Sequence, residues 1–350
     1  TLTWTDKRFS LCFRKWKAMN YYLYKLAFRT PVHFGESMSA RSLQSSGFTL
    51  CADTLFSGLC HEAARAGGPD KIHLLASPVQ KGELLFSDLF PYSGSELYLP
   101  RPMFPPAEHR PIESGDRKKL KKLLWIPISG LQNYCASLQG TAKLDVDSLA
   151  HSFGQMDAVT KVSLAGRSES KQPTPYDVGI FSFSEGCGLY GIAASKNAQT
   201  LRAVQGLLKR LGYTGLGGKL SAGYGKYVVA EELMESSGVD CGKPEASFLF
   251  RSLEDSAEEH QLLLTTSLPQ EREMKNALQG AYYSVRRRGG FVQSNSYADT
   301  PRKKQTQFFL ASGSVLRTRF AGGLYDVSGS AGNHPVYRYA RPLFMGVKLP

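Results

Sequence analysis

The succession of hydrophobic patterns between residues 21 and 231 limits the fold of this chain more than any other feature. Residues 21–30 alternate in polarity and place Tyr22, Tyr24, Leu26 and Phe28 on one face, which predicts a half-buried strand. The main elements then follow in the order strand, helix, strand, strand, helix, strand, which is typical of ferredoxin-like and RRM-like domains and predicts an α+β fold. Later strands are predicted at residues 84–91 and 226–231, and residues 178–183 and 188–194 are predicted as a pair of strands.

Capping residues mark the ends of the two predicted helices. Asp53 precedes an apolar helical face and is the predicted N-cap of the first helix, which ends at Gly67 and Gly68. Asn197 is the predicted N-cap of the second helix, which ends at Gly212. Residues 184–186 predict a turn that pairs the two strands on either side of it.

The rest of the chain predicts an insertion and a weaker second half. Residues 139–177 have little periodicity and are expected to leave the core, and residues 238–244 are typical of a linker. We therefore expect an N-terminal RRM-like domain at residues 19–237 and a degenerate second one at residues 245–350. In the second half, strands are predicted at residues 260–268, 281–292, 305–316 and 336–349, with a short helix at 271–278.

The stretch before Met19 differs from the rest. Residues 1–18 are rich in lysine, arginine and aromatic residues and lack the apolar segment of a secretory signal. We expect a non-native or disordered extension, for example read-through sequence, with a mitochondrial-type presequence as the alternative. The formal net charge of the chain is +13, and it remains +9 without this stretch.

A basic balance of this size indicates a polyanionic partner, usually nucleic acid. The charge is unevenly distributed. Residues 228–273 contain three basic and eleven acidic residues, whereas residues 274–350 contain twelve basic and two acidic residues. This division predicts a basic face for RNA and an acidic face for a basic neighbour or solvent, although two differently solvated surfaces would give the same pattern.

The spacing of the cysteines and the hydropathy give no sign of a metal site, a redox motif or a membrane span. Six cysteines are scattered without a C-x-x-C pair, so neither a zinc site nor a redox motif is indicated. Free thiols fit a reducing compartment, and we expect a cytoplasmic protein without metal or cofactor. No apolar run approaches eighteen residues, so no membrane span is expected.

The strongest local motif is the glycine-rich stretch at residues 214–227. Its glycines allow backbone N–H groups to turn toward an anion, two lysines add charge, and Tyr224 offers a stacking face. It is not a Walker loop, because Lys219 is followed by leucine. It predicts contact with an RNA backbone, and the alternative is a flexible connection. Its candidate RNA-binding residues are Gly215, Gly217, Gly218, Lys219, Ser221, Gly223 and Tyr224.

Two basic runs add further candidates. Arg286, Arg287 and Arg288 lie close to aromatic residues, and arginine forks suit phosphates. The alternative for this run is an edge strand whose charges prevent aggregation. The run at residues 117–122 is more typical of a solvated loop than of a phosphate track.

His33, in the loop after the first strand, raises the question of catalysis. A metal-independent ribonuclease needs a general base and acid, often histidine with lysine or tyrosine. A lone loop histidine is more often structural or a contact to a base, and no paired carboxylates, H-x-x-x-H motif or nucleophile elbow occurs. The motifs therefore favour RNA binding without a catalytic residue.

An ordered set of motifs resembles the RAMP superfamily, and more narrowly the fourth Csm subunit of type III-A CRISPR effectors. The resemblance covers residues 19–350, and the set is more specific than the glycine-rich stretch alone. It consists of His33-Phe34-Gly35-Glu36, residues 52–59, Phe90-Pro91-Tyr92, Leu97-Tyr98-Leu99-Pro100, the glycine-rich stretch and residues 334–339.

This resemblance implies a non-catalytic subunit that binds the 5′ handle of the crRNA. It also implies contacts with the large polymerase-cyclase subunit and with the backbone RAMP subunit, and a β-hairpin thumb that separates the handle from the guide. Residues 157–175 are the best thumb candidate, with Lys161 and Arg167 near the RNA. His33 and Gly35 are further expected RNA contacts.

Two other functions stay open. One is a crRNA-processing endoribonuclease of the same superfamily with His33 as general base, although such enzymes usually carry the glycine-rich loop near the C-terminus. The other is a structural subunit that contacts only protein, against which the lysines of the glycine-rich stretch argue.

Overall fold

The computed structural model describes residues 19–35, 43–105, 114–143, 145–163, 174–235, 242–294, 296–329 and 332–348. In these ranges no helix is both long and apolar enough to cross a lipid bilayer. The α-helices are α1 (Ala52–Gly67), α2 (His73–Gln80), α3 (Ser114–Lys122), α4 (Leu131–Gln139), α5 (Val146–Leu149), α6 (Ala198–Thr214), α7 (Pro244–Glu254) and α8 (Glu271–Leu278). Short 3-10 helices lie at η2 (Pro69–Ile72), η3 (Ile128–Gly130) and η4 (Leu220–Ala222). The strands are β1 (Asn20–Phe28), β2 (Leu84–Phe86), β3 (Phe90–Ser93), β4 (Glu96–Pro100), β5 (Trp125–Pro127), β6 (Gly154–Ser163), β7 (Thr174–Phe183), β8 (Cys187–Ser195), β9 (Tyr227–Glu235), β10 (His260–Leu263), β11 (Val285–Arg288), β12 (Gln307–Leu310), β13 (Val315–Leu316), β14 (Gly323–Asp326), β15 (Tyr337–Ala340) and β16 (Phe344–Val347).

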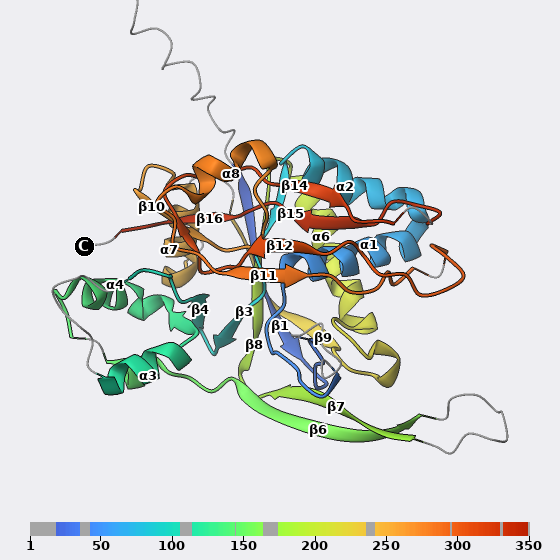
Figure 1. Cartoon of the computed structure of the whole chain (residues 1–350), viewed down its shortest axis with the longest axis horizontal. Coiled ribbons are helices and arrows are strands. Elements are labelled where there is room, and N and C mark those ends of the chain that lie inside the picture. Colours follow the sequence, from blue (N-terminus) through green and yellow to red (C-terminus); the bar gives the residue numbers. More distant parts are fainter. Residues whose placement is uncertain are drawn as a thin grey trace, which may run out of the picture.

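An antiparallel sheet in the order β5-β4-β3-β8-β1-β9 forms the centre of the molecule, and β2 also pairs with β8. Strand β1 lies between β8 and β9 and pairs antiparallel with both. Helices α1 and α6 contact each other and lie to one side of this sheet (Figure 1). Helices combined with antiparallel sheets confirm the predicted α+β class.

Strand β1 is buried on both faces. Tyr22 and Tyr24 pack into the cluster that contains the apolar sides of α1 and α6. Tyr21, on the opposite face, stacks on Phe250 of α7 with ring centroids 5.8 Å apart. The prediction of a half-buried strand is therefore wrong, because the C-terminal half of the chain covers the face that was expected to meet water.

Helix α1 begins one residue before Asp53, so the prediction of Asp53 as N-cap is wrong. The N-cap position is Cys51, whose side chain makes no capping hydrogen bond. Instead, Asp88 Oδ1 accepts a hydrogen bond from the Ala52 N–H at 2.8 Å. The Asp88 carboxylate, from the segment between β2 and β3, thus accepts a hydrogen bond at the helix N-terminus that a local N-cap side chain would otherwise accept.

Helix α6 follows its prediction at the N-terminus. The Asn197 side chain caps it by accepting from the Gln199 N–H at 2.9 Å. The helix continues past the predicted end at Gly212, and Gly215 closes it with a positive φ of 99°.

Strands β7 and β8 flank the predicted turn but do not pair with each other. The Cys187 N–H donates to Ser184 O at 3.0 Å, so the chain does turn there. Strand β7 pairs instead with β6 over the whole ladder from Gly154↔Phe183 to Ser163↔Thr174, while β8 enters the central sheet. The β6–β7 hairpin projects from the lower side of the molecule (Figure 1) and contains the described part of residues 157–175.

The C-terminal half is built around the small sheet β13-β10-β16 and the ribbons β11–β12 and β14–β15. The strand predicted at 305–316 is divided into β12 and β13 by a turn at Gly313, whose φ is 92°. The strand predicted at 336–349 is likewise divided into β15 and β16. Helix α7, which Pro244 begins, follows the predicted linker and was not predicted.

The two halves share their hydrophobic cores. Tyr339 of β15 is fully buried against Phe56 of α1, with ring centroids 5.6 Å apart. Its hydroxyl accepts a hydrogen bond from the Phe86 N–H at 2.8 Å. Because apolar side chains of both halves belong to the same clusters, the halves bury each other's surface and hold the site between them.

Candidate nucleic-acid interface

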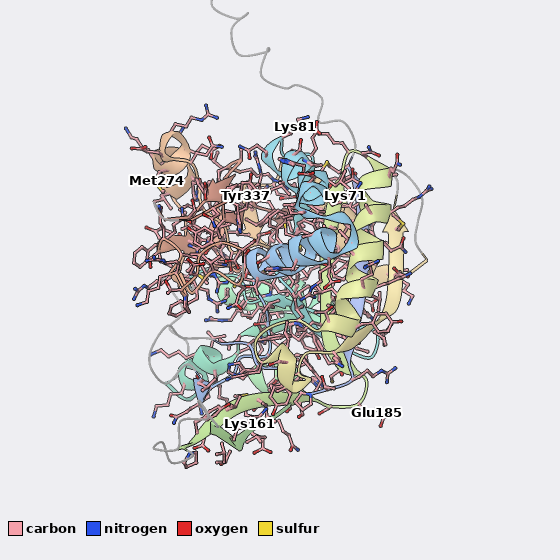
Figure 2. All side chains as sticks on the ribbon, turned by 90° about the vertical axis from the view of Figure 1, so that its right-hand side faces the viewer. Lys71, Lys81, Lys161, Glu185, Met274 and Tyr337 are labelled. Carbon is pink, nitrogen blue, oxygen red and sulfur yellow. The ribbon has the colours of Figure 1, made fainter. Side chains whose placement is uncertain are left out.

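A cleft of about 600 Å³ lies where the glycine-rich stretch meets α1 and the C-terminal half. Thr54, Ser57, His61 and Arg65 line it from α1, at spacings of three and four residues that place them on one side of the helix. Tyr337, which Figure 2 labels among the side chains of the C-terminal half, also lines it. The cleft therefore combines residues from three distant parts of the sequence.

The charged side chains that line the cleft are mostly cationic. Five are lysine or arginine and two are carboxylates. Both carboxylates are already paired, Asp53 with Arg288 at 2.6 Å and Glu62 with Arg65 at 2.7 Å. Within the described residues no ion pair involves Lys219 or Lys304, so these two lysines bring positive charge to the cleft without a salt-bridged carboxylate.

The pair between Asp53 and Arg288 is buried and bidentate. Arg288 Nε donates to Asp53 Oδ2 at 2.9 Å and Nη2 donates to Oδ1 at 2.6 Å. Burial acts to raise the pKa of the Asp53 carboxyl, but the charge and hydrogen bonds of Arg288 outweigh it and hold this pKa below its usual value. Asp53 therefore fixes the guanidinium at the edge of the cleft instead of capping α1.

The folded chain is expected to owe an acid-sensitive part of its stability to Asp53. Since the folded pKa lies below the unfolded value of about 3.9, this stabilisation is complete above that pH and is lost as the pH falls through the folded pKa. In that window the one carboxyl should change the free energy of unfolding by up to about 1.4 kcal/mol per pH unit. Urea unfolding at stepped pH measures it, and the same slope in the Asp53→Asn variant would contradict the expectation.

His61 and Lys304 are cleft residues that sequence reasoning missed. Burial lowers the pKa of His61, and the charges of Arg65 and Lys304 lower it further, so the imidazole is neutral at pH 7. Burial likewise lowers the pKa of Lys304. Two signals could have identified them: the polar side of α1 opposite its apolar side, and the basic run that ends at Lys304.

The glycine-rich stretch folds onto the loop after β1 as a compact ledge. Gly218 N–H donates to His33 O at 2.8 Å, and Gly225 N–H donates to Pro31 O at 2.9 Å. Gly215 and Gly223 N–H groups are also bonded to backbone carbonyls, those of Leu211 and Leu220. The prediction that the glycine N–H groups turn toward an anion is therefore wrong for these four glycines.

The glycines at two positions of this stretch permit close packing that no other residue allows. Gly217 has a φ of 103°, and a Cβ there would lie 2.6 Å from the Phe34 ring. Gly225 has a φ of 75°, and a Cβ there would lie 2.1 Å from Leu216 O. Absence of a side chain is required at both positions, by conformation and by space.

His33 lies beneath the ledge and is 7% exposed. Its Nδ1 donates to Gly179 O at 2.6 Å, which links the loop after β1 to strand β7. Its ring also limits the space at Gly218, where a Cβ would lie 2.8 Å from His33 Cδ2. In this position the side chain supports the ledge, while Gly35, two residues later, is exposed.

Two reciprocal cation–π contacts join the ledge to the β6–β7 hairpin. Lys161 Nζ lies 4.4 Å from the centroid of the Tyr224 ring, and Lys219 Nζ lies 5.0 Å from that of Tyr176. Lys161 and Tyr176 face each other across the hairpin, whose lower position Figure 2 shows at Lys161. The structure thus brings three predicted residues together, and Arg167 lies outside the described residues.

The predicted basic runs, residues 286–288 and 117–122, do not form one continuous positively charged surface. Arg286 and Arg288 point to α1, where Arg286 Nη1 lies 3.1 Å from Cys51 Sγ and Arg288 contacts Asp53. Arg286 and Arg287 are both exposed, and Arg287, which lies between Arg286 and Arg288 on the strand, points to the opposite face from these two. Of the three, only Arg288 lines the cleft. The run at residues 117–122 lies in helix α3, not in a loop.

Comparison with known proteins gives matches along most of the chain. Residues 256–347 match the family model described as the CRISPR Csm4 C-terminal domain. The CRISPR system Cms protein Csm4 of Mycobacterium tuberculosis is 37% identical, over 94% of this chain and 98% of that protein. The protein of the same name from Streptococcus thermophilus is 27% identical, over 95% of this chain and 100% of that protein.

Solved structures share the fold. A chain of the Csm3-Csm4 subcomplex of the type III-A CRISPR-Cas interference complex superposes with a TM-score of 0.59 at 14% identity, over 94% of this chain and 99% of that chain. A chain of the Csm1-Csm4 cassette in complex with cA4 gives a TM-score of 0.56 at 17% identity, over 95% and 99%. At these identities the likeness concerns the fold alone.

Proposed function

This chain belongs to the Csm4 family of CRISPR proteins, and from that membership we propose that it is a non-catalytic subunit of a type III-A interference complex that binds the 5′ handle of crRNA. The observation that carries the proposal is the cleft of about 600 Å³ with two lysines, Lys219 and Lys304, that form no ion pair within the described residues. An unpaired RNA strand has the phosphates that such lysines bind and the exposed bases that polar and aromatic side chains contact.

The residues of the cleft divide into two roles in this proposal. Lys304 from the C-terminal half and Lys219 from the ledge bind phosphates as charges. His61 is neutral at pH 7, so it takes part through hydrogen bonds and ring contacts with bases. The Asp53–Arg288 pair has no net charge and holds the wall of the cleft in place. Positive charge then gives affinity for any strand, and contacts to bases give preference for the handle.

The assembly is proposed by analogy with the solved relatives. Those relatives occur in a Csm3-Csm4 subcomplex and in a Csm1-Csm4 cassette. We infer that this chain likewise joins the large polymerase-cyclase subunit to the backbone RAMP subunit. The hairpin β6–β7 acts as the thumb between handle and guide, a role that its projection from the molecule supports.

Two further features support the proposal. The central strands β9-β1-β8-β2, with α1 and α6 between them in sequence, follow the order of a ferredoxin-like domain, and we assign that domain here. His33 would be the general base if the chain were an endoribonuclease. Its side chain is 7% exposed, and its Nδ1 donates a hydrogen bond to Gly179 O. A buried imidazole committed in this way is poorly placed to accept a proton from RNA.

Removing the charge of Lys304 is expected to weaken RNA binding about tenfold, as the loss of one charge-assisted contact does. The Lys304→Met variant should also make the slope of log affinity against log salt less negative by about 0.7. Lys303→Met is the matched control, because Lys303 is exposed and lies over Phe291 at 5.9 Å instead of lining the cleft. Fluorescence anisotropy with handle RNA measures both, and equal losses in the two variants would contradict the role of the cleft.

Co-purification tests the function as a whole. The chain is expressed with its neighbouring Csm subunits and a crRNA, and the RNA that remains bound is sequenced. RNA with one common 5′ end, and no cleavage of repeat RNA by the isolated chain, is the expected result. Cleaved repeats would favour the endoribonuclease, and a complex that forms without this chain touching RNA would leave only a structural role.

A further inference from the structure

A second pocket, distinct from the cleft, lies at the root of the β6–β7 hairpin. It has a volume of about 400 Å³ and contacts α3, β5, α5 and the first residue of β6, Gly154. Six of its fifteen lining residues carry aromatic rings, namely Phe48, Tyr98, Trp125, His151, Phe153 and Phe181. We call it the α3 pocket.

Two aromatic side chains in the wall of the α3 pocket stack on each other. The His151 imidazole stacks on Tyr98 with centroids 5.6 Å apart and an interplanar angle of 28°. Phe48 contacts Phe181 and Phe153 at 4.9 and 5.6 Å. His151 is exposed, and Leu124 at the same pocket is 59% exposed, so apolar and aromatic surface meets water here. A planar ligand would remove that surface from water.

Helix α3 places positively charged side chains beside this aromatic surface. Leu120 faces the core and is 8% exposed, whereas the lysines on either side of it are exposed. Lys119 and Lys122 line the pocket, and Lys119 contacts Asp147 at 2.5 Å. Among the described residues Lys122 has no ion-pair partner. The basic run, which does not line the cleft, therefore lies next to an aromatic pocket and contributes Lys119 and Lys122 to its lining.

We propose that the α3 pocket binds one unpaired nucleotide of the RNA strand, with the base against the aromatic wall and its phosphate at Lys122. The proposal rests on the RNA-binding function above and extends it to a second site. Stacking rings next to lysines suit a nucleotide, which is at once planar and anionic. An apolar segment of a protein would cover the rings but would leave Lys122 without a counter-charge.

The position of the α3 pocket relative to the cleft fits one continuous strand. Gly154 lines the pocket, and Lys161, seven residues farther along β6, contacts Tyr224 of the ledge. At about 3.3 Å per residue these two points of the hairpin are about 23 Å apart. The hairpin thus connects the two sites, and a strand that follows it from the cleft reaches the α3 pocket.

Two pairs of matched variants test the α3 pocket in the co-purified complex. Leu124→Glu places a carboxylate at the mouth, and Leu74→Glu is its control, since both leucines are 59% exposed and Leu74 lies on α2. Lys122→Ala removes the free lysine, and Lys121→Ala is its control on the same helix. We expect Leu124→Glu to lower RNA affinity about tenfold, as the loss of one stacked base does, and Leu74→Glu to change it less than twofold.

Cross-linking locates the nucleotide directly. RNA that carries 4-thiouridine at successive positions is irradiated, and the cross-linked peptides are identified by mass spectrometry. One position should cross-link to the segment around His151, and this product should disappear in Leu124→Glu while products from residues 214–227 stay.

The outcomes separate this inference from the proposed function. Normal affinity in Leu124→Glu, with cross-links confined to residues 214–227 and 288–304, would overturn the α3 pocket as a nucleotide site and would leave the cleft intact. If Leu124→Glu kept normal RNA affinity but another Csm subunit were lost from the complex, the pocket would be a protein contact. That result would also overturn the α3 pocket as a nucleotide site. Absence of RNA binding in the unaltered complex would remove both proposals.

Discussion

Gly225→Ala is expected to reduce RNA affinity more than tenfold, because it deforms the ledge that carries Lys219. Gly225 has a φ of 75°, a conformation that costs an L-residue about 1–2 kcal/mol. The new Cβ would also lie 2.1 Å from Leu216 O, and that backbone is held in place because Leu216 N–H donates to Gly225 O at 2.9 Å. Neither atom can move away without breaking this hydrogen bond or the one from Gly225 N–H to Pro31 O.

Gly223→Ala is the matched control for this prediction. Gly223 has a φ of 85°, but a Cβ there would meet nothing within 4 Å. It therefore carries the conformational penalty without the collision and should retain affinity within about threefold. Anisotropy titrations with handle RNA, together with the unfolding temperature of each variant, separate loss of the ledge from loss of the fold. Equal affinity of the two variants would show that the ledge does not position the RNA contacts.

Asp88→Ala is expected to lower the free energy of unfolding by about 3 kcal/mol or more, since each buried group left without a partner costs about 1–3 kcal/mol. Asp88 is 4% exposed and accepts three hydrogen bonds. One comes from the Ala52 N–H at the start of α1, and two come from the backbone and hydroxyl of Thr266 at 3.0 and 2.6 Å. The substitution removes an acceptor that joins the two halves of the chain.

Asp70→Ala is the control, because Asp70 is exposed in η2 and should change stability by less than about 0.5 kcal/mol. Urea unfolding measures both variants. Thr266→Val adds a second test: it removes the hydroxyl and keeps the backbone donor, so its effect should be smaller and should not add to that of Asp88→Ala. Additive losses would mean that Asp88 does not stabilise the junction through Thr266.

Local patterns in the sequence predicted the elements whose cause is local. Asn197 caps α6 as expected, because its side chain needs only the N–H group two residues later. The glycine-rich stretch was identified as part of a site because its composition is unusual along the chain, and it does line the cleft. Its glycines, however, serve close packing against His33 and Leu216 more than exposure of N–H groups.

Several of the predictions that were wrong depended on a distant partner. Asp53 looked like an N-cap because it precedes an apolar helical face, but its partner Arg288 is 235 residues away. Strand β1 looked half-buried because its alternation is visible, while the cover provided by α7 is not. His61 and Lys304 share the cleft only after α1 and the C-terminal half have met.

Backbone periodicity, steric preference and charge are properties of neighbouring residues. The amino-acid sequence alone was therefore enough for the α+β class, for strand β1 and helices α1 and α6, and for a basic character that suits RNA. Which carboxylate pairs with Arg288, which lysines stay unpaired in the cleft, and which aromatic rings form the α3 pocket were determined by packing between segments far apart in the chain. Burial and charge pairing depend on distances between side chains in the folded protein, and separation along the sequence does not give these distances.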